Sequence, residues 1–161
     1  MQDEKQVGEL GFIPEGDRYE NLLWGSQINT NRIDASLKIG YVFPELSYKS
    51  FGFQSAYSNH RQEAFYGFRN YDIDHKSFYS NLLYNSIIGN TKNKFKLGFN
   101  FSYDHYLETV DAFYFNRNDI SVGSFFEYSY DSLEDFNLVA GIRIDSHNRL
   151  GTFVTPRLHL R

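Results

Sequence analysis

The chain has 161 residues, which suits a single domain, and its 16 Phe and 13 Tyr favour strands over helices. A net charge of −4, with no Lys/Arg run of five or more, argues against a nucleic-acid partner. Since there is no cysteine, disulfides, thiolate metal sites and cysteine nucleophiles are excluded.

Residues 1–29 show only a weak pattern, and they are predicted to form a polar loop or part of one strand. Their first ten residues, MQDEKQVGEL, are polar and acidic, unlike a secretory signal peptide. No apolar run in the chain approaches the roughly 18 residues of a membrane helix.

From residue 30 onward, in the predicted barrel segment 30–161, apolar residues recur at every second position, which is the period of a strand. Seven strands are predicted, near residues 31–43, 50–60, 75–88, 94–106, 119–130, 136–147 and 152–161. They exceed the usual globular length of about 5–6 residues and suit the roughly 9–11 residues of a tilted membrane strand. The sequence therefore predicts an all-β fold, an antiparallel up-and-down transmembrane β-barrel, here an incomplete wall of about seven to eight strands.

Each predicted strand has an apolar row and a polar row. The apolar row runs from Ile33 to Leu160. Uncharged side chains of this kind are what a lipid-facing surface requires. The polar row is expected to face the lumen and carries these charges: Asp34, Lys38, Lys94, Lys96, Glu127, Arg143 and Asp145. They either pair across the wall, as Arg143 with Glu127, or contact a partner in the lumen. Pro156 cannot donate a ladder bond, so a local break or bulge is expected there.

Short connections are expected near Pro44–Lys49, Gly89–Asn93 and Asp131–Asp135, and long ones near His60–His75 and Glu108–Asn118. Such alternation is typical of outer-membrane barrels, which have short periplasmic turns and longer outer loops. Aromatic residues gather where strands meet the short turns, as in a girdle at headgroup depth: Tyr41, Phe43, Phe51, Phe95, Tyr128, Tyr130 and Phe136.

One expected outer loop combines aromatic rings with arginines, which could contact a ligand by stacking: Arg61, Phe65, Tyr66, Phe68, Arg69 and Tyr71. The alternative, which is favoured, is that these rings pack the loop on itself. The same two interpretations apply to Phe113–Phe115 beside Arg117.

Two polar sets could ligate a metal, but neither has a recognised ligand spacing, so solvated loops are the favoured interpretation. The sets are Asp72, Asp74 and His75, and Asp104, His105 and Glu108. No catalytic or dinucleotide motif is present. The sequence thus predicts no enzyme, no cofactor and no metal site.

Several segments resemble the barrel of TonB-dependent outer-membrane receptors over roughly residues 24–161. The resemblance rests on FFEYSY (125–130), FNLVAGIRID (136–145) and GTFVTPRLHLR (151–161), with NTNR (29–32), KSFY (76–79) and SIIGN (86–90) in support. It implies one segment of a 22-stranded barrel in a Gram-negative outer membrane. It further implies a plug domain, TonB and lipid as partners, and import of a nutrient such as a siderophore, cobalamin or glycan.

Two other functions remain open. The chain could form a small complete outer-membrane barrel with a structural or adhesive role, if residues 17–29 supply an eighth strand. It could also be a soluble β-sandwich or lipid-binding barrel, whose apolar face would point inward.

Overall fold

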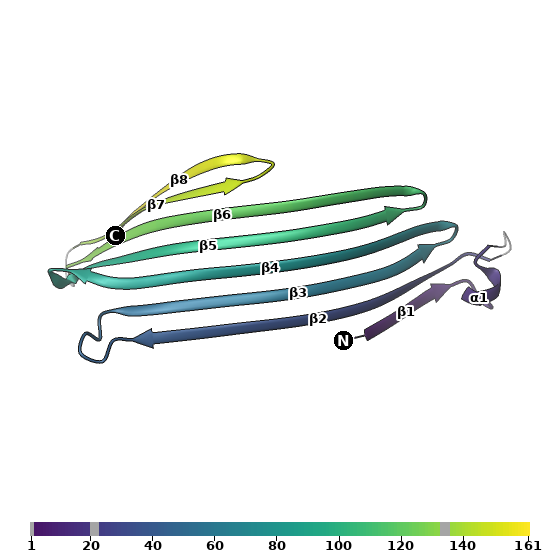
Figure 1. Ribbon diagram of the computed structural model, residues 1–161, viewed down its shortest axis with the longest axis horizontal. Coiled ribbons are helices and arrows are strands. Elements are labelled where there is room, and N and C mark those ends of the chain that lie inside the picture. Colours follow the sequence, from purple (N-terminus) through teal and green to yellow (C-terminus); the bar gives the residue numbers. More distant parts are fainter. Residues whose placement is uncertain (1, 20–22, 133–135) are drawn as a thin grey trace. The chain divides into compact units, whose positions relative to one another are not determined.

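The computed structural model describes residues 2–19, 23–132 and 136–161, and these form one antiparallel sheet with strand order β1 to β8 (Figure 1). The predicted all-β, up-and-down wall is confirmed. The strands are β1 (Gln2–Gly8), β2 (Gly25–Val42), β3 (Ser50–Tyr66), β4 (Arg69–Ile88), β5 (Asn90–Val110), β6 (Phe113–Asp131), β7 (Asn137–His147) and β8 (Gly151–Leu160). A four-residue helix, α1 (Pro14–Asp17), lies between β1 and β2.

The prediction of long loops near His60–His75 and Glu108–Asn118 was wrong, because strands continue through both segments up to short turns. β3 and β4 meet at a two-residue turn, where Gly67 has a φ of 59°, and β5 and β6 meet at another, where Asp111 has a φ of 53°. Backbone ladder bonds do not need an apolar row, so pairing persists where both faces become polar and the hydrophobic alternation fades.

The first 29 residues form more structure than a polar loop. β1 pairs with the start of β2 from Gln2↔Asn31 to Gly8↔Gly25. Residues 25–29 belong to β2 itself, so the eighth strand is β1 and does not come from residues 17–29. The expected turn at Asp131–Asp135 lies partly outside the described residues, since 133–135 are not described.

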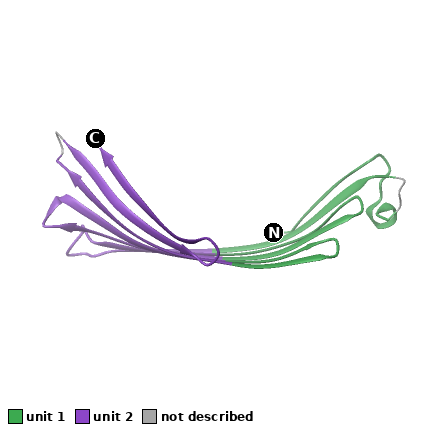
Figure 2. Cartoon of the chain, turned by 90° about the horizontal axis from the view of Figure 1, so that it is seen from above, with its two compact units in different colours: residues 1–35, 57–77, 104–118 green, residues 36–56, 78–103, 119–161 purple. Residues whose placement is uncertain are grey.

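The chain divides into two compact units (Figure 2), to which β2–β6 each contribute residues. Unit 1 comprises residues 1–35, 57–77 and 104–118, and unit 2 comprises residues 36–56, 78–103 and 119–161. Among the described residues, the buried hydrophobic side chains are Phe12, Ala64 and Phe65, all in unit 1. The described residues of unit 2 therefore form a sheet without a conventional apolar core.

The register in unit 2 places the apolar residues of neighbouring strands side by side. Phe126 pairs with Ile142 across β6 and β7, and the pairs Leu138↔Leu160 and Ala140↔Leu158 continue the row across β7 and β8. Rings on β4, β5 and β6 extend it, since Tyr84 and Phe126 both contact the Phe95 ring. The row stays open: Leu37 is 52% exposed and Leu158 is 69% exposed.

The break expected at Pro156 was also wrong, because β7 and β8 pair without interruption from Leu138↔Leu160 to His147↔Gly151. Asn137 and Arg161 exchange two backbone hydrogen bonds, of 2.8 and 3.0 Å. Hydrogen-bonded pairs then recur at the odd-numbered residues of β8, so the nitrogen of Pro156 points away from β7. Its missing N–H costs this ladder nothing.

Unit 1 has a small core under the β1–β2 connection. The ring of Phe12 lies over the paired glycines Gly8 and Gly25, where a Cβ on Gly25 would come within 2.1 Å of it. Phe65 packs against Phe12 with ring centroids 6.3 Å apart, and the Arg18 guanidinium lies 4.4 Å from the centre of the Phe65 ring. No helix among the described residues is long and apolar enough to cross a membrane.

Candidate functional site

The polar row of unit 2 contains a hollow of about 590 Å³, formed by β4 to β8. Its lining combines charged, polar and apolar side chains, including Leu83, Asn85, Lys96, Phe125, Glu127, Arg143, Thr155 and Arg157. The predicted charges Lys96, Glu127 and Arg143 thus lie around one surface feature, and Arg157 is a fourth member that sequence reasoning did not single out.

Glu127 holds two cations of the hollow. Its carboxylate accepts a hydrogen bond of 3.2 Å from Lys96 Nζ on β5 and one of 3.4 Å from Arg157 Nη1 on β8. The side chain of Glu127 is only 17% exposed, whereas those of Lys96 and Arg157 are 55% and 69% exposed. The carboxylate therefore lies beneath the two cations that it pairs with.

The expected pair between Arg143 and Glu127 was wrong. Arg143 lies opposite Phe125, two residues away from the position facing Glu127, which pairs with Gly141. Arg143 instead donates to Asp145 through Nε and Nη2, at 2.6 and 2.7 Å, and to the side-chain oxygen of Asn100 at 2.9 Å.

Two glycines make room for this arrangement. The Phe125 ring covers Gly98, where an added Cβ would come within 2.0 Å of the ring. A Cβ on Gly123 would come within 2.2 Å of the Asp145 carboxylate and within 2.5 Å of the Asn100 oxygen. Glycine in a strand commonly marks such a close approach.

The other predicted lumen-facing charges lie outside the hollow. Lys38 and Lys94 are exposed on β2 and β5. Asp34 belongs to unit 1, where it pairs with Arg32 at 2.9 Å.

The six expected loop contacts lie on β3 and β4 or in the turn between them, all in unit 1. Phe65 is buried, so the alternative that its ring packs locally is the one observed. Arg61 pairs with Glu63 at 2.9 Å on an exposed surface, and Tyr66, Phe68 and Arg69 are exposed. Tyr71 lies near the turn, beyond the predicted membrane strand, and burial raises its pKa, with a further contribution from the charge of Glu108. Phe113, Tyr114 and Phe115 are likewise exposed.

A cluster that sequence reasoning missed lies on β4, β5 and β6 in unit 1. His75 pairs with Asp104 at 2.9 Å and stacks on the Tyr106 ring, with centroids 4.0 Å apart. The guanidinium of Arg117 lies 4.2 Å from the centre of the same ring. The two polar sets that were considered as metal ligands are divided by strand alternation, and no group of three metal-binding side chains occurs among the described residues.

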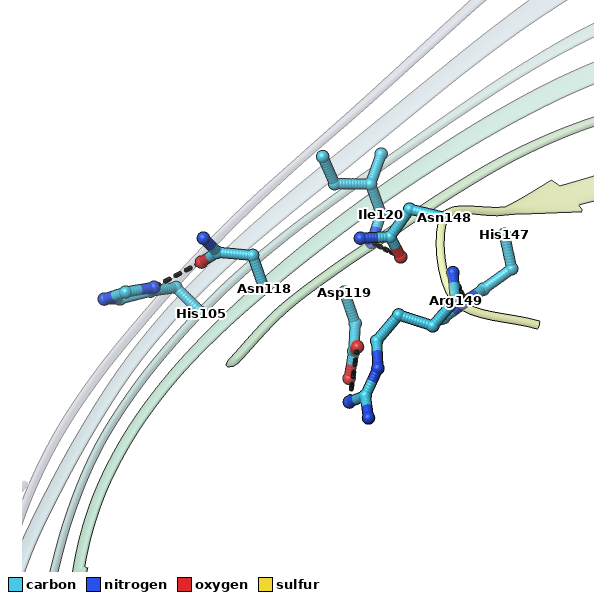
Figure 3. A network of polar contacts seen from close by, with 7 residues as sticks. All are labelled: His105, Asn118, Asp119, Ile120, His147, Asn148 and Arg149. Atoms are coloured by element: carbon cyan, nitrogen blue, oxygen red, sulfur yellow. Dashed lines mark hydrogen bonds and ion pairs between the residues drawn. The ribbon is translucent and has the colours of Figure 1, made fainter. Parts of the chain in front are cut away.

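Polar side-chain contacts also join neighbouring parts of the sheet within each unit (Figure 3). In unit 1, His105 and Asn118 share a side-chain hydrogen bond. In unit 2, the Asn148 side chain accepts a 3.0 Å bond from the backbone N–H of Ile120, and Arg149 reaches Asp119 at 3.4 Å. The second set ties the β7–β8 turn to β6.

Several solved structures with a similar fold are outer-membrane receptors. The alcaligin outer-membrane receptor FauA of Bordetella pertussis matches 86% of this chain with a TM-score of 0.66 and 12% identity. The siderophore receptor PirA and the pyoverdine-bound FpvA, both of Pseudomonas aeruginosa, match 86% with TM-scores of 0.59 and 0.60 and identities of 12% and 13%. The chain spans 26%, 26% and 23% of these three proteins. No protein-family model and no curated protein sequence matches it.

These structures define the class of fold as a segment of the wall of a large β-barrel. More specifically, the resemblance to TonB-dependent receptors that the sequence suggested agrees with the siderophore receptors found by structure.

Proposed function

We propose that this chain is a segment of the barrel wall of a TonB-dependent nutrient receptor in a Gram-negative outer membrane. The observation that carries the proposal is the open apolar row of unit 2, which continues across β6, β7 and β8. Such a row is unfavourable in water and favourable against hydrocarbon. The polar row, with its charged hollow, then lines the lumen.

The fold likeness supports the same function. The neighbours FauA and PirA are described as receptors for alcaligin and for siderophores, so a siderophore leads the substrate classes, ahead of cobalamin and glycans. In this proposal the wall surrounds a plug domain, and TonB drives import. Lipid is the partner of the apolar row, and the chain itself performs no catalysis.

The alternative of a small closed barrel has less support. At the two ends of the sheet, β1 pairs with β2 and β8 pairs with β7. An open edge is not tolerated in lipid, so an eight-stranded barrel would also need β1 to pair with β8. A soluble sandwich is disfavoured because its apolar row would be buried, and here it is exposed.

Two neighbouring phenylalanines test the proposal, since Phe125 and Phe126 point to opposite faces of β6. These 161 residues contain no cysteine, so Phe126→Cys and Phe125→Cys each add one labelling site to this segment. In the complete gene product, folded in lipid vesicles, a nitroxide at position 126 should be reached by oxygen dissolved in lipid. A nitroxide at position 125 should be reached by a water-soluble nickel complex. The reverse pattern, or water access to both positions, would overturn the proposal.

A further inference from the structure

The hollow in unit 2 presents positive charge to its surroundings, although its formal charge is nearly balanced. Its lining contributes three positive charges, from Lys96, Arg143 and Arg157, and one negative charge, from Glu127. Asp145, which pairs with Arg143 beside the hollow, adds a second negative charge. The cationic side chains are 43–69% exposed, whereas the carboxylates are 17% and 25% exposed. An incoming group therefore meets ammonium and guanidinium donors first.

These cations also have donors to spare. An ammonium carries three N–H donors and a guanidinium five. Among the described residues, Lys96 donates one hydrogen bond and Arg157 one, both to Glu127 at distances above 3.1 Å. The remaining donors can bind another oxyanion without breaking a short existing bond.

The surroundings of the cations strengthen such binding. The Phe125 ring, seated over Gly98, and Leu83 give the hollow apolar parts, which lower the local dielectric and strengthen charge–charge attraction. Thr155 and Asn85 add neutral hydrogen-bonding groups. A volume of about 590 Å³ falls within the usual range for small-ligand sites.

We propose that this hollow is an anion-binding site that takes a carboxylate group between Lys96 and Arg157. The planar guanidinium fork matches a carboxylate, and the ammonium adds a point charge. The carboxylate could belong to a small acid in the lumen or to an Asp or Glu side chain of a protein segment there. The site rests on the proposed function only in being placed on the lumen side.

Binding of citrate, a small tricarboxylate, to the complete gene product in detergent micelles tests the chemistry by calorimetry. Arg157→Gln and Lys96→Gln should each weaken binding about tenfold, because each removes a charge-assisted hydrogen bond. Arg161→Gln is the matched control, as it removes a cation directly after the end of β8, outside the hollow, and should leave the affinity unchanged. Glu127→Gln should tighten binding, because it removes the competing carboxylate.

A zero-length carbodiimide cross-linker shows whether the bound carboxylate belongs to a protein segment or to a small acid, since it joins the Lys96 amine to a protein carboxylate in contact with it. Mass spectrometry should find the Lys96–Glu127 link and, if a protein segment supplies the carboxylate, a second link from Lys96 to that segment. Citrate binding without a second link assigns the site to small acids.

Two results would overturn the site. One is the absence of both citrate binding and a second cross-link, and the other is equal weakening by Arg157→Gln and Arg161→Gln. The labels at positions 125 and 126 report on the membrane orientation independently, so failure of the anion site and failure of the receptor proposal remain distinguishable.

Discussion

Gly98 illustrates how a single residue shapes the polar face of the wall. The Phe125 ring occupies the space where a side chain on residue 98 would lie, with ring atoms 2.0–2.7 Å from the position of an added Cβ. Gly40 lies on the polar row of β2 and has no atom within 4 Å of its own added Cβ. The two glycines therefore differ in packing, although both lie inside strands of unit 2.

We expect Gly98→Ala to destabilise the folded protein by about 1–3 kcal/mol, because the added methyl group would displace the Phe125 ring from its position over residue 98. Gly40→Ala should be neutral or stabilising by up to about 1 kcal/mol, since alanine is less flexible in the unfolded chain. Urea unfolding of the complete gene product in detergent micelles measures both effects. Equal stability of the two variants would show that the ring does not depend on Gly98.

The partners of individual charges could not be predicted from the sequence. Strand alternation correctly placed Arg143 and Glu127 on one row, but it does not fix the register between strands. The register puts Phe125 opposite Arg143, and Asp145, two residues along the same strand, becomes the partner of the guanidinium. Arg157 was missed for the same reason, since only the register brings β8 beside Glu127.

At the scale of the strand, Pro156 shows why the same residue can break one ladder and leave another intact. Its nitrogen points away from β7, while the nitrogen of Thr155 points toward β7, where Thr155 pairs with Arg143. The position of a proline relative to the ladder therefore matters more than its presence in the strand.

We expect Thr155→Pro to destabilise the β7–β8 hairpin by about 1–3 kcal/mol, because it leaves a backbone carbonyl of β7 without its donor. Pro156→Val should keep the hairpin and its register, because no β7 bond depends on residue 156. Hydrogen exchange of the β7 and β8 amides in the folded protein distinguishes the two variants. Rapid exchange across the hairpin in Pro156→Val would contradict this account.

The sequence predicts some parts of the strands and misses others. Strands with an apolar row, such as β5 near Phe95–Tyr103, were predicted because lipid-facing side chains must be apolar at every second position. The parts of β3–β6 that lie beyond the predicted strands, and the whole of β1, have polar residues on both faces. The pairing of these parts therefore leaves no hydrophobic pattern in the sequence. Backbone hydrogen bonds hold these parts together, and every residue but proline can supply them.

At the scale of the whole molecule, the division into units coincides on β5 and β6 with a change in the outward row. On β5 the row is apolar from Phe95 to Tyr103 in unit 2, and His105 follows it as the first polar member in unit 1. On β6, Asn118 in unit 1 precedes Ile120 and Val122 in unit 2. In the proposed receptor, unit 2 is the part that crosses the membrane and unit 1 the part in water.

Leu97 and Leu107 on β5 provide a matched test of this boundary, because both carry odd numbers in the outward row. Their side chains are 44% and 42% exposed. If both positions were surrounded by water, a charged side chain would therefore have a similar effect on the folding free energy at either one. Leu97 belongs to unit 2 and Leu107 to unit 1. We expect Leu97→Lys to cost about 2–4 kcal/mol of folding free energy in lipid vesicles, and Leu107→Lys less than about 1 kcal/mol. Unfolding in urea, followed by gel mobility of unheated samples, measures both. Equal costs would mean that no hydrocarbon boundary separates the two leucines, and the apolar row would then need an occupant other than lipid.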